Sequence, residues 1–173
     1  MESRIAAGAS HDVVWLGNVL EHVLDPVGLL VSTRNLVKPD GVMVATVPND
    51  GSPFQERLLE GGLIPGRFWI AVPDHISYFT AESLRRTAAH AGWNCLALQA
   101  DFPIDWFLSH PGSNYVADRG KGPDAHRARI ALELQIGRSG PEIANRLYAA
   151  LAEAGFGRNI TAFLRPASQG GQS

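Results

Sequence analysis

Two short runs of consecutive hydrophobic residues frame the first part of the chain, at positions 12–16 and 42–47. Both are rich in β-branched residues, which is typical of strands buried on both faces of a parallel sheet. Between them, hydrophobic residues recur with helical spacing from a start at Asp25. Lys38 falls in the last helical turn, before a break at residues 39–41. Strand, helix and strand at this spacing predict a right-handed parallel βαβ unit.

The same kind of pattern predicts further elements along the chain. Ser52 has a glutamine three residues later, which has the form of a capping box and predicts a helix to about position 59. Thr80 is the expected cap of a second helix, which ends at Gly92. The remaining expected elements are a strand at 94–100, helices at 124–136 and 141–154, and an alternating strand at 159–164. This order predicts an α/β domain over residues 12–166, with a flexible N-terminus at 1–11 and a disordered tail at 167–173.

Glycine and proline interrupt residues 61–66, directly before the aromatic pair Phe68 and Trp69. A segment of this kind that follows the carboxyl end of a strand has the composition of a mobile lid. The alternative is an ordinary long loop whose aromatic rings pack on the core. The residues at 101–116 carry no clear pattern.

Polar side chains follow both hydrophobic runs of the βαβ unit. Asn18, Glu21 and His22 come after the first run, and Asn49 and Asp50 come after the second. In parallel sheets ligands bind outside the carboxyl ends of the strands. These residues therefore predict a ligand-binding α/β domain, without saying which ligand.

Bulk properties exclude several classes of partner. The chain has 173 residues, a net charge of −2 and no long basic run, so nucleic acid is not an expected partner. A single cysteine, Cys95, forms no internal disulfide, and the N-terminus does not resemble a secretory signal. No hydrophobic run approaches the length of a membrane span. We expect a cytoplasmic protein with no membrane partner.

Three motifs together resemble a known family. They are V-L-E-H-V-L-D-P at 19–26, L-V-K-P-D-G-V-M-V-A-T-V-P-N at 36–49 and D-H-I-S-Y-F-T-A-E-S-L at 74–84. They resemble the second half of class I S-adenosylmethionine-dependent methyltransferases, and within these the ubiquinone-biosynthesis and sugar-methyltransferase branches. The resemblance is strong over residues 12–92. It implies a partial Rossmann-like sheet with flanking helices, in which the last strand is antiparallel and inserts between the two before it.

The sequence also departs from the family pattern. The glycine-rich loop that grips the cofactor after the family's first strand has no counterpart, nor has the acidic residue that holds the ribose. Eleven residues precede Asp12, too few for the βα units expected there. The resemblance implies S-adenosylmethionine as cofactor and a small-molecule or sugar-like acceptor, with the activity incomplete in this chain alone. The first strand would then be an exposed edge through which the chain self-associates.

The resemblance also assigns roles to particular residues. His75 is the expected base near the acceptor, because a histidine pKa of about 6.5 suits proton transfer near neutrality. Glu21 and His22 are further catalytic candidates. The alternatives are that His75 is a helix-entry residue bonded to backbone and that the other two brace the following helix. In ubiquinone-type relatives an acidic pair and this histidine hold a divalent cation, but Asn18 replaces the first acidic ligand, so no metal is expected.

Cofactor contacts are expected from the segment at the end of the first strand, namely Trp15, Gly17 and Asn18. For Trp15, as for Phe79, a place in the core is the competing and favoured interpretation. The side chains of Trp69, Trp106, Phe107 and Tyr115 are candidates for an acceptor-binding wall or for ordinary packing. The competing functional hypotheses are a non-catalytic module with a truncated methyltransferase fold and, more weakly, a nucleotide-sugar or dinucleotide enzyme.

Overall fold

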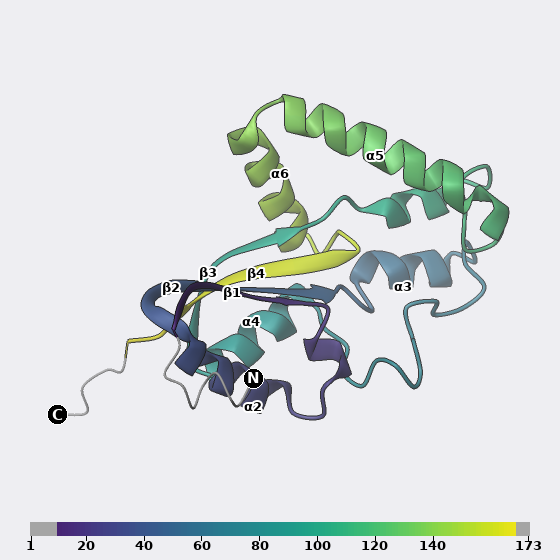
Figure 1. The fold of residues 1–173 in the computed structure, drawn as a ribbon. Helices are drawn as coiled ribbons and strands as arrows, with labels where there is room; N and C mark the ends of the chain where they lie inside the picture. Colours follow the sequence, from purple (N-terminus) through teal and green to yellow (C-terminus); the bar gives the residue numbers. More distant parts are fainter. Residues whose placement is uncertain (1–9, 169–173) are drawn as a thin grey trace.

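The computed structural model describes residues 10–168. The fold is built on a four-stranded mixed sheet (Figure 1). The expectations for residues 1–9 and 169–173 lie outside this range. The strand order is β1-β2-β4-β3, with β1 parallel to β2 and β4 antiparallel to both neighbours. The strands are β1 (His11–Gly17), β2 (Val37–Pro48), β3 (Trp93–Ala100) and β4 (Asn159–Pro166). The predicted βαβ unit and the inserted antiparallel last strand are both confirmed.

The helix of the βαβ unit, α2 (Pro26–Thr33), is shorter than predicted. It begins as expected, because the Asp25 carboxylate accepts a 2.8 Å hydrogen bond from the backbone N–H of Gly28. It ends at Thr33, however, and β2 already begins at Val37 after a short 3₁₀ turn, Arg34–Leu36.

The prediction that Lys38 lies in the last helical turn is therefore wrong. The register of β1 against β2 jumps from His11 opposite Val37 to Val13 opposite Val42, so the residues between form a bulge in β2. A Cβ at Gly41 would lie 2.9 Å from the carbonyl oxygen of Asp12, and glycine permits this close approach. Lys38 instead pairs with the carboxylate of Asp12, at 2.7 Å.

The other predicted helices are present. The capping box at Ser52 and the cap at Thr80 are both formed. The helices are α3 (Pro53–Glu60), α4 (Ala81–His90), α5 (Gly122–Arg138) and α6 (Pro141–Glu153). The 3₁₀ turns are η1 (Leu20–His22), η2 (Arg34–Leu36), η3 (Ile104–Ser109), which lies in the unassigned region, and η4 (Arg119–Lys121).

The core lies between the sheet and helices α2 and α4, which are below the sheet in Figure 1, and α6 above the sheet adds Leu151 and Ala152 to the same cluster. Every second residue of the central strands points into it, so the alternation predicted for the last strand is confirmed. Trp93 joins the layers, because its buried indole N–H donates to the carbonyl oxygen of Leu30 on α2 at 3.0 Å. The fully buried core residues include Leu30, Met43, Ala45, Val47, Leu84, Ala88, Ile160, Ala162 and Leu164.

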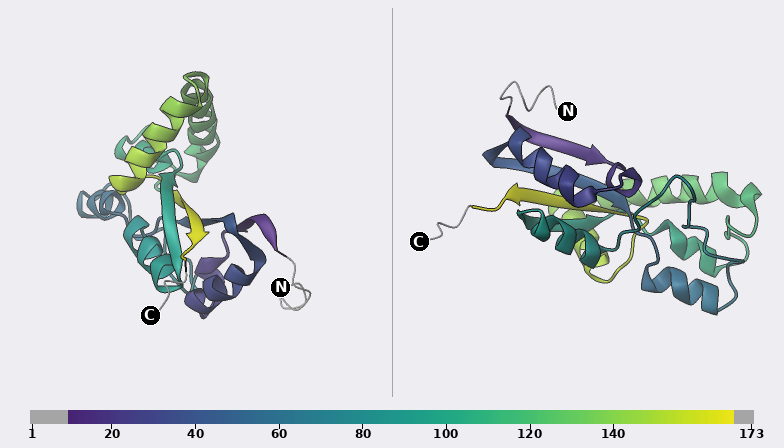
Figure 2. Two further views of the ribbon diagram at one scale, coloured as in Figure 1. Left: turned by 90° about the vertical axis from the view of Figure 1, so that its left-hand side faces the viewer. Right: turned by 90° about the horizontal axis from the view of Figure 1, so that it is seen from below.

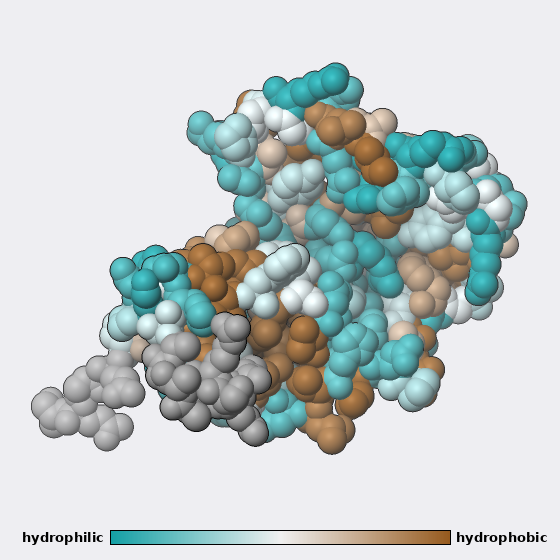
Figure 3. Space-filling model, viewed as in Figure 1, coloured by the Kyte–Doolittle hydropathy of each residue, from teal (hydrophilic) through white to brown (hydrophobic). Residues whose placement is uncertain are grey.

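Strand β1 is an edge, and its outer face is exposed. Figure 2 shows it at the border of the sheet, and Figure 3 shows hydrophobic surface over this part of the molecule. Val14 and Leu16 pack against the core, but Val13 is 60% exposed and Trp15 is 72% exposed. The expectations of a strand buried on both faces and of a core position for Trp15 are therefore wrong. No described helix covers this face of β1.

Among residues 10–168, no helix is both long and hydrophobic enough to cross a membrane.

Candidate functional site

Three segments meet beyond the carboxyl ends of β1 and β2. They are the η1 turn, the residues that follow β2, and the segment 74–79 that leads into α4. The backbone joins them, because the carbonyl oxygen of Glu21 accepts the N–H groups of Ile76 at 2.8 Å and Ser77 at 3.1 Å. The N–H of Asp50 donates to the carbonyl oxygen of Phe79 at 2.9 Å. The two polar groups predicted at the strand ends thus belong to one site, with His75 between them.

Glu21 contributes a carboxylate that is buried without a hydrogen-bond partner. The residue is 1% exposed, and neither of its carboxylate oxygens has a partner among the described residues. The Nε2 atom of His22 lies 3.8 Å from its Oε1 atom. A buried and unpaired carboxylate is costly, which makes the Glu21 carboxylate a candidate for contact with a ligand or a proton.

His22 links the η1 turn to the segment before α4. Its Nδ1 lies 2.6 Å from the carbonyl oxygen of Asp74, and its ring packs edge-on against His75 with the centroids 5.0 Å apart. This contact braces the segment 74–79, whereas the sequence analysis considered a brace of the helix that follows, α2.

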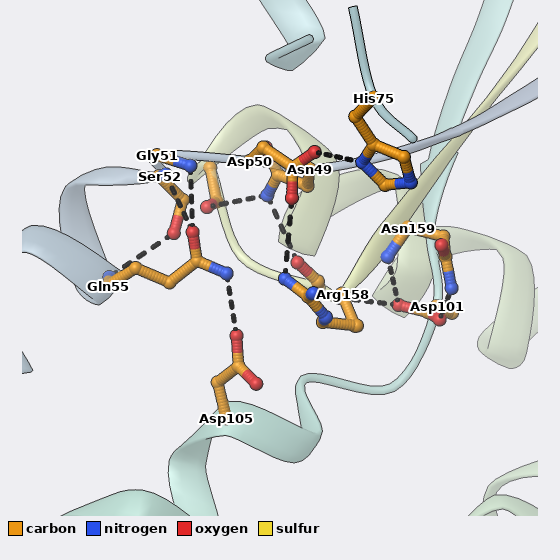
Figure 4. A network of polar contacts seen from close by, with 12 residues as sticks. Asn49, Asp50, Gly51, Ser52, Gln55, His75, Asp101, Asp105, Arg158 and Asn159 are labelled. Atoms are coloured by element: carbon orange, nitrogen blue, oxygen red, sulfur yellow. Dashed lines mark hydrogen bonds and ion pairs between the residues drawn. The ribbon is translucent and has the colours of Figure 1, made fainter. Parts of the chain in front are cut away.

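His75 lies beside a carboxylate that the sequence analysis did not assign a catalytic role (Figure 4). Its Nδ1 is 3.7 Å from Oδ2 of Asp50, and the other oxygen of Asp50 is 3.5 Å from Nη1 of Arg158. The Asp50 side chain is 1% exposed. Burial raises the pKa of Asp50, and the charges of Arg158 and His75 oppose that rise.

Sequence reasoning missed Arg158, because it is more than 100 positions from Asp50 and belongs to no motif. The turn before β4 holds it in place. The Asp101 carboxylate accepts the backbone N–H groups of Arg158 and Asn159 at 2.6 and 2.8 Å. The guanidinium carbon lies 5.2 Å from the ring centroid of Phe68, a cation–π distance.

Below Arg158, a buried polar network supports the site. The Gln55 amide donates to Asp105 at 2.9 Å, and the Tyr115 hydroxyl donates to the same carboxylate at 2.7 Å. Burial and the neighbouring Asp105 charge raise the pKa of Tyr115, so it stays a neutral donor.

The aromatic residues named as candidates for an acceptor wall have packing partners within the protein. Trp69 is buried in a second hydrophobic cluster with Leu58 and Leu108, so packing explains it. Tyr115 is committed to Asp105, and Trp106 packs edge-on against Phe156. The place of Phe79 in the core is confirmed.

The residues expected on the cofactor side lie at the exposed end of β1. Gly17 is the last residue of the strand, and the Trp15 ring lies over it, 3.2 Å from where a Cβ would be. Asn18 has a φ of 53°, a left-handed conformation that asparagine tolerates better than most residues. Its N–H continues the pairing to β2 by donating to Thr46 at 2.9 Å.

A metal ion has three candidate ligands here. Glu21, His22 and His75 each offer one ligand atom, and these atoms lie within 4.8 Å of one another. The sequence analysis counted only the first two of these ligands. Two imidazole nitrogens and one carboxylate oxygen match Zn²⁺ better than Mg²⁺, which prefers oxygen ligands. The expectation that no metal is held stays a prediction.

Comparisons with known sequences identify related proteins. A family model described as "Methyltransferase domain" matches residues 5–98, more than half of the chain. Two ubiquinone biosynthesis O-methyltransferases from strains of Cereibacter sphaeroides are 44% and 46% identical to this chain over 48 residues. This segment is 28% of the chain and 19% of each relative, so the similarity spans only a small part of the relatives.

Comparison with solved structures supports the fold. A SAM-dependent methyltransferase from Archaeoglobus fulgidus superposes with a TM-score of 0.51 at 15% identity, covering 94% of this chain and 63% of the other. The family match covers both strands of the βαβ unit, the segment that carries His75, and α4. The chain therefore belongs to the methyltransferase domain family that this model describes.

Proposed function

We propose that the site takes part in methyl transfer from S-adenosylmethionine to a hydroxyl of a small-molecule or sugar-like acceptor, with His75 as the base. The observation that carries this proposal is the place of His75, at the carboxyl ends of β1 and β2 and 3.7 Å from the buried carboxylate of Asp50. S-Adenosylmethionine supplies a methyl group activated by a sulfonium. The protein positions the acceptor and removes its proton.

Glu21 and His22 serve the same site in a different way. His22 holds the segment 74–79 against the η1 turn through its contact with Asp74. The unpaired carboxylate oxygens of Glu21 would contact a cationic ligand such as a sulfonium. Trp15, Gly17 and Asn18 would line the cofactor side, since they occupy the end of the exposed strand.

The alternative is a non-catalytic module that binds a partner chain. It is favoured by one observation, the exposed hydrophobic edge at β1 with Val13 and Trp15 on its surface. In this proposal the chain self-associates through β1 or pairs there with another strand. The two functions differ in what they require of His75, because only the enzyme needs its imidazole.

The experiment is a transfer assay with S-adenosylmethionine labelled in its methyl group. The chain is tested with panels of catechols and sugars, alone and as a chimera that carries the N-terminal half of the Cereibacter sphaeroides enzyme. We expect transfer by the chimera and none by a His75→Gln chimera. The proposal fails if the two chimeras transfer methyl groups at the same rate. The proposal also fails if neither chimera transfers a methyl group under two conditions. Calorimetry must show that both chimeras bind S-adenosylmethionine, and the panels must include a hydroxyl acceptor that the intact Cereibacter sphaeroides enzyme methylates.

A further inference from the structure

A histidine base works only if the correct ring nitrogen is free of its proton. A neutral imidazole carries one proton, and the hydrogen bond made by one nitrogen decides which form is present. The backbone of His75 is held by a 2.8 Å hydrogen bond from its N–H to the carbonyl oxygen of Ala71. This bond fixes the chain but not the protonated nitrogen. Another group must select it.

Two carboxylates and two imidazoles make up the neighbourhood, and they divide into two pairs. Glu21 lies 3.8 Å from Nε2 of His22, and Asp50 lies 3.7 Å from Nδ1 of His75. Only Asp50 has a cation on its far side, since Arg158 is 3.5 Å from its other oxygen. A neighbouring guanidinium favours the ionised form of a carboxylate, and only the ionised form accepts at both oxygens.

Asp50 is also anchored through its backbone and through its neighbour in the chain. Its own N–H is bonded to Phe79, two residues before α4 begins, and the preceding Asn49 is bonded to the turn that carries Arg158. The facing atoms are ready to pair, because Nδ1 of His75 and both oxygens of Asp50 lack hydrogen-bond partners among the described residues. Their separation is somewhat longer than a hydrogen bond, as is common in sites without ligand.

We propose that Asp50 is the positioning residue for His75: it accepts the Nδ1–H of the ring and so leaves Nε2 free to take a proton from the acceptor. Arg158 holds Asp50 in its ionised form and in place. The inference rests on the proposed base role of His75 and extends it. When the acceptor hydroxyl gives its proton to Nε2, the ring becomes an imidazolium. The Asp50 carboxylate then faces a full positive charge, and the proton is afterwards released to water.

The test is nuclear magnetic resonance of the histidine rings in the ¹⁵N-labelled chain, which requires no methyl transfer. Long-range ¹H–¹⁵N spectra distinguish the two neutral forms, and loss of a signal set in His75→Gln assigns this ring. We expect the Nδ1–H form in the unaltered chain and a shift toward the Nε2–H form in Asp50→Ala. Asp50→Asn should retain part of the Nδ1–H form, because its amide oxygen still accepts.

Glu21→Gln is the matched control, since it changes the other buried carboxylate of the site. It should leave the form of the His75 ring unchanged. An Nε2–H ring in the unaltered chain overturns the proposal, even if the Asp50 variants do not fold. The proposal is also overturned if the His75 ring keeps the Nδ1–H form in an Asp50→Ala variant whose backbone amide spectrum is native. An Nδ1–H ring in a chimera that transfers no methyl group would count against the proposed function only.

Discussion

The side-chain amide of Asn49 donates a 3.0 Å hydrogen bond to the carbonyl oxygen of Gly157. This bond, with a second one to Gly155 at 3.2 Å, ties the end of β2 to the turn before β4. Asp50 follows Asn49 in the chain, and Arg158 follows Gly157. The geometry of their ion pair therefore depends on the backbone at Gly157.

Gly157→Ala should strongly destabilise the chain. The residue has a φ of 96°, and an added Cβ would lie 2.5 Å from the Cβ of Ala100. The left-handed backbone alone costs about 1–2 kcal/mol. Gly140→Ala is the control, because its φ of 94° is the same but open space surrounds it. Urea unfolding should show the larger loss at Gly157; equal losses would mean that the contact with Ala100 is relieved at little cost.

His75→Ala should slow methyl transfer while the affinity for S-adenosylmethionine stays nearly unchanged. A general base typically contributes about a hundredfold to ten-thousandfold in rate. Turnover is measured in the active chimera across a range of pH, and cofactor affinity is measured by calorimetry. An unaltered rate at every pH would remove His75 from the mechanism.

Asp50→Asn should flatten the pH dependence of stability in mildly acidic solution. Burial raises the pKa of Asp50 above its ordinary 3.8, so the folded state holds this proton more tightly than the unfolded state does. The contribution of this proton to the free energy of unfolding is fully present below pH 3.8, the ordinary pKa of the carboxyl in the unfolded state. It is lost as the pH rises through the pKa of the folded state. The free energy of unfolding should therefore fall across this window in the unaltered chain and fall less in Asp50→Asn.

Asp12→Asn should change the pH dependence of the free energy of unfolding in the opposite direction. The hydrogen bond and charge of Lys38 lower the pKa of Asp12, so its contribution is present above 3.8 and is lost as the pH falls through the lowered pKa. The effect should be small, because the pair is exposed and screened by salt. Urea unfolding at several pH values measures both variants. A slope that Asp50→Asn leaves unchanged would show that Asp50 titrates alike in both states.

The chain should contain no tightly bound magnesium. Glu21 supplies a single carboxylate, and Mg²⁺ needs more oxygen ligands than this. The imidazole nitrogens of the two histidines do not replace oxygen ligands for a hard cation. Elemental analysis of the purified protein and activity of the chimera after chelation are the measurements. Activity that is lost on chelation and restored by magnesium would overturn this expectation, whereas retained zinc would assign His75 as a third ligand.

The exposed strand β1 should cause weak self-association of the isolated chain. Its edge lacks a strand partner in the described structure, and Val13 and Trp15 present hydrophobic surface beside it. Val13→Lys should reduce association, because a charged edge residue opposes pairing with another strand. Val31→Lys, an exposed change on α2, is the control. Sedimentation that shows a monomer at all concentrations would refute association through this edge.

Binding of S-adenosylmethionine by the isolated chain should be weak or absent, since Trp15, one of the expected cofactor contacts, is 72% exposed at the edge strand β1. Calorimetric titration of monodisperse protein is the measurement. Micromolar binding by a monomer would show that the residues around β1 form a complete pocket.

Local signals in the sequence were sufficient to predict most of the fold. The caps at Asp25, Ser52 and Thr80 act within a few residues, so helix starts followed from the sequence. The end of α2 did not, because the bulge in β2 depends on pairing with β1. Trp15 was misplaced for a similar reason: its exposure depends on which elements cover the strand, and a run of hydrophobic residues does not record this.

Residues of the candidate site could be named from the sequence where they belong to contiguous motifs, and were missed where their position depends on distant contacts. Glu21, His22 and His75 belong to recognisable motifs. Arg158 reaches Asp50 only because β4 inserts beside β2, and no local pattern marks it. Periodicity describes which face of an element is hydrophobic, but not which side chain from another element will meet it.

The central position of β4 has a consequence for synthesis of the protein. β2 and β3 each pair with β4 and not with each other, so a growing chain on the ribosome cannot close the sheet until β4 has been made. Arg158 emerges at the same late stage. His75 and Asp50 therefore lack their cation until the turn before β4 has been made, and pairings over this sequence separation form slowly. A nascent chain would expose the open sides of β2 and β3 in that interval, and chaperones have their longest opportunity to bind it then.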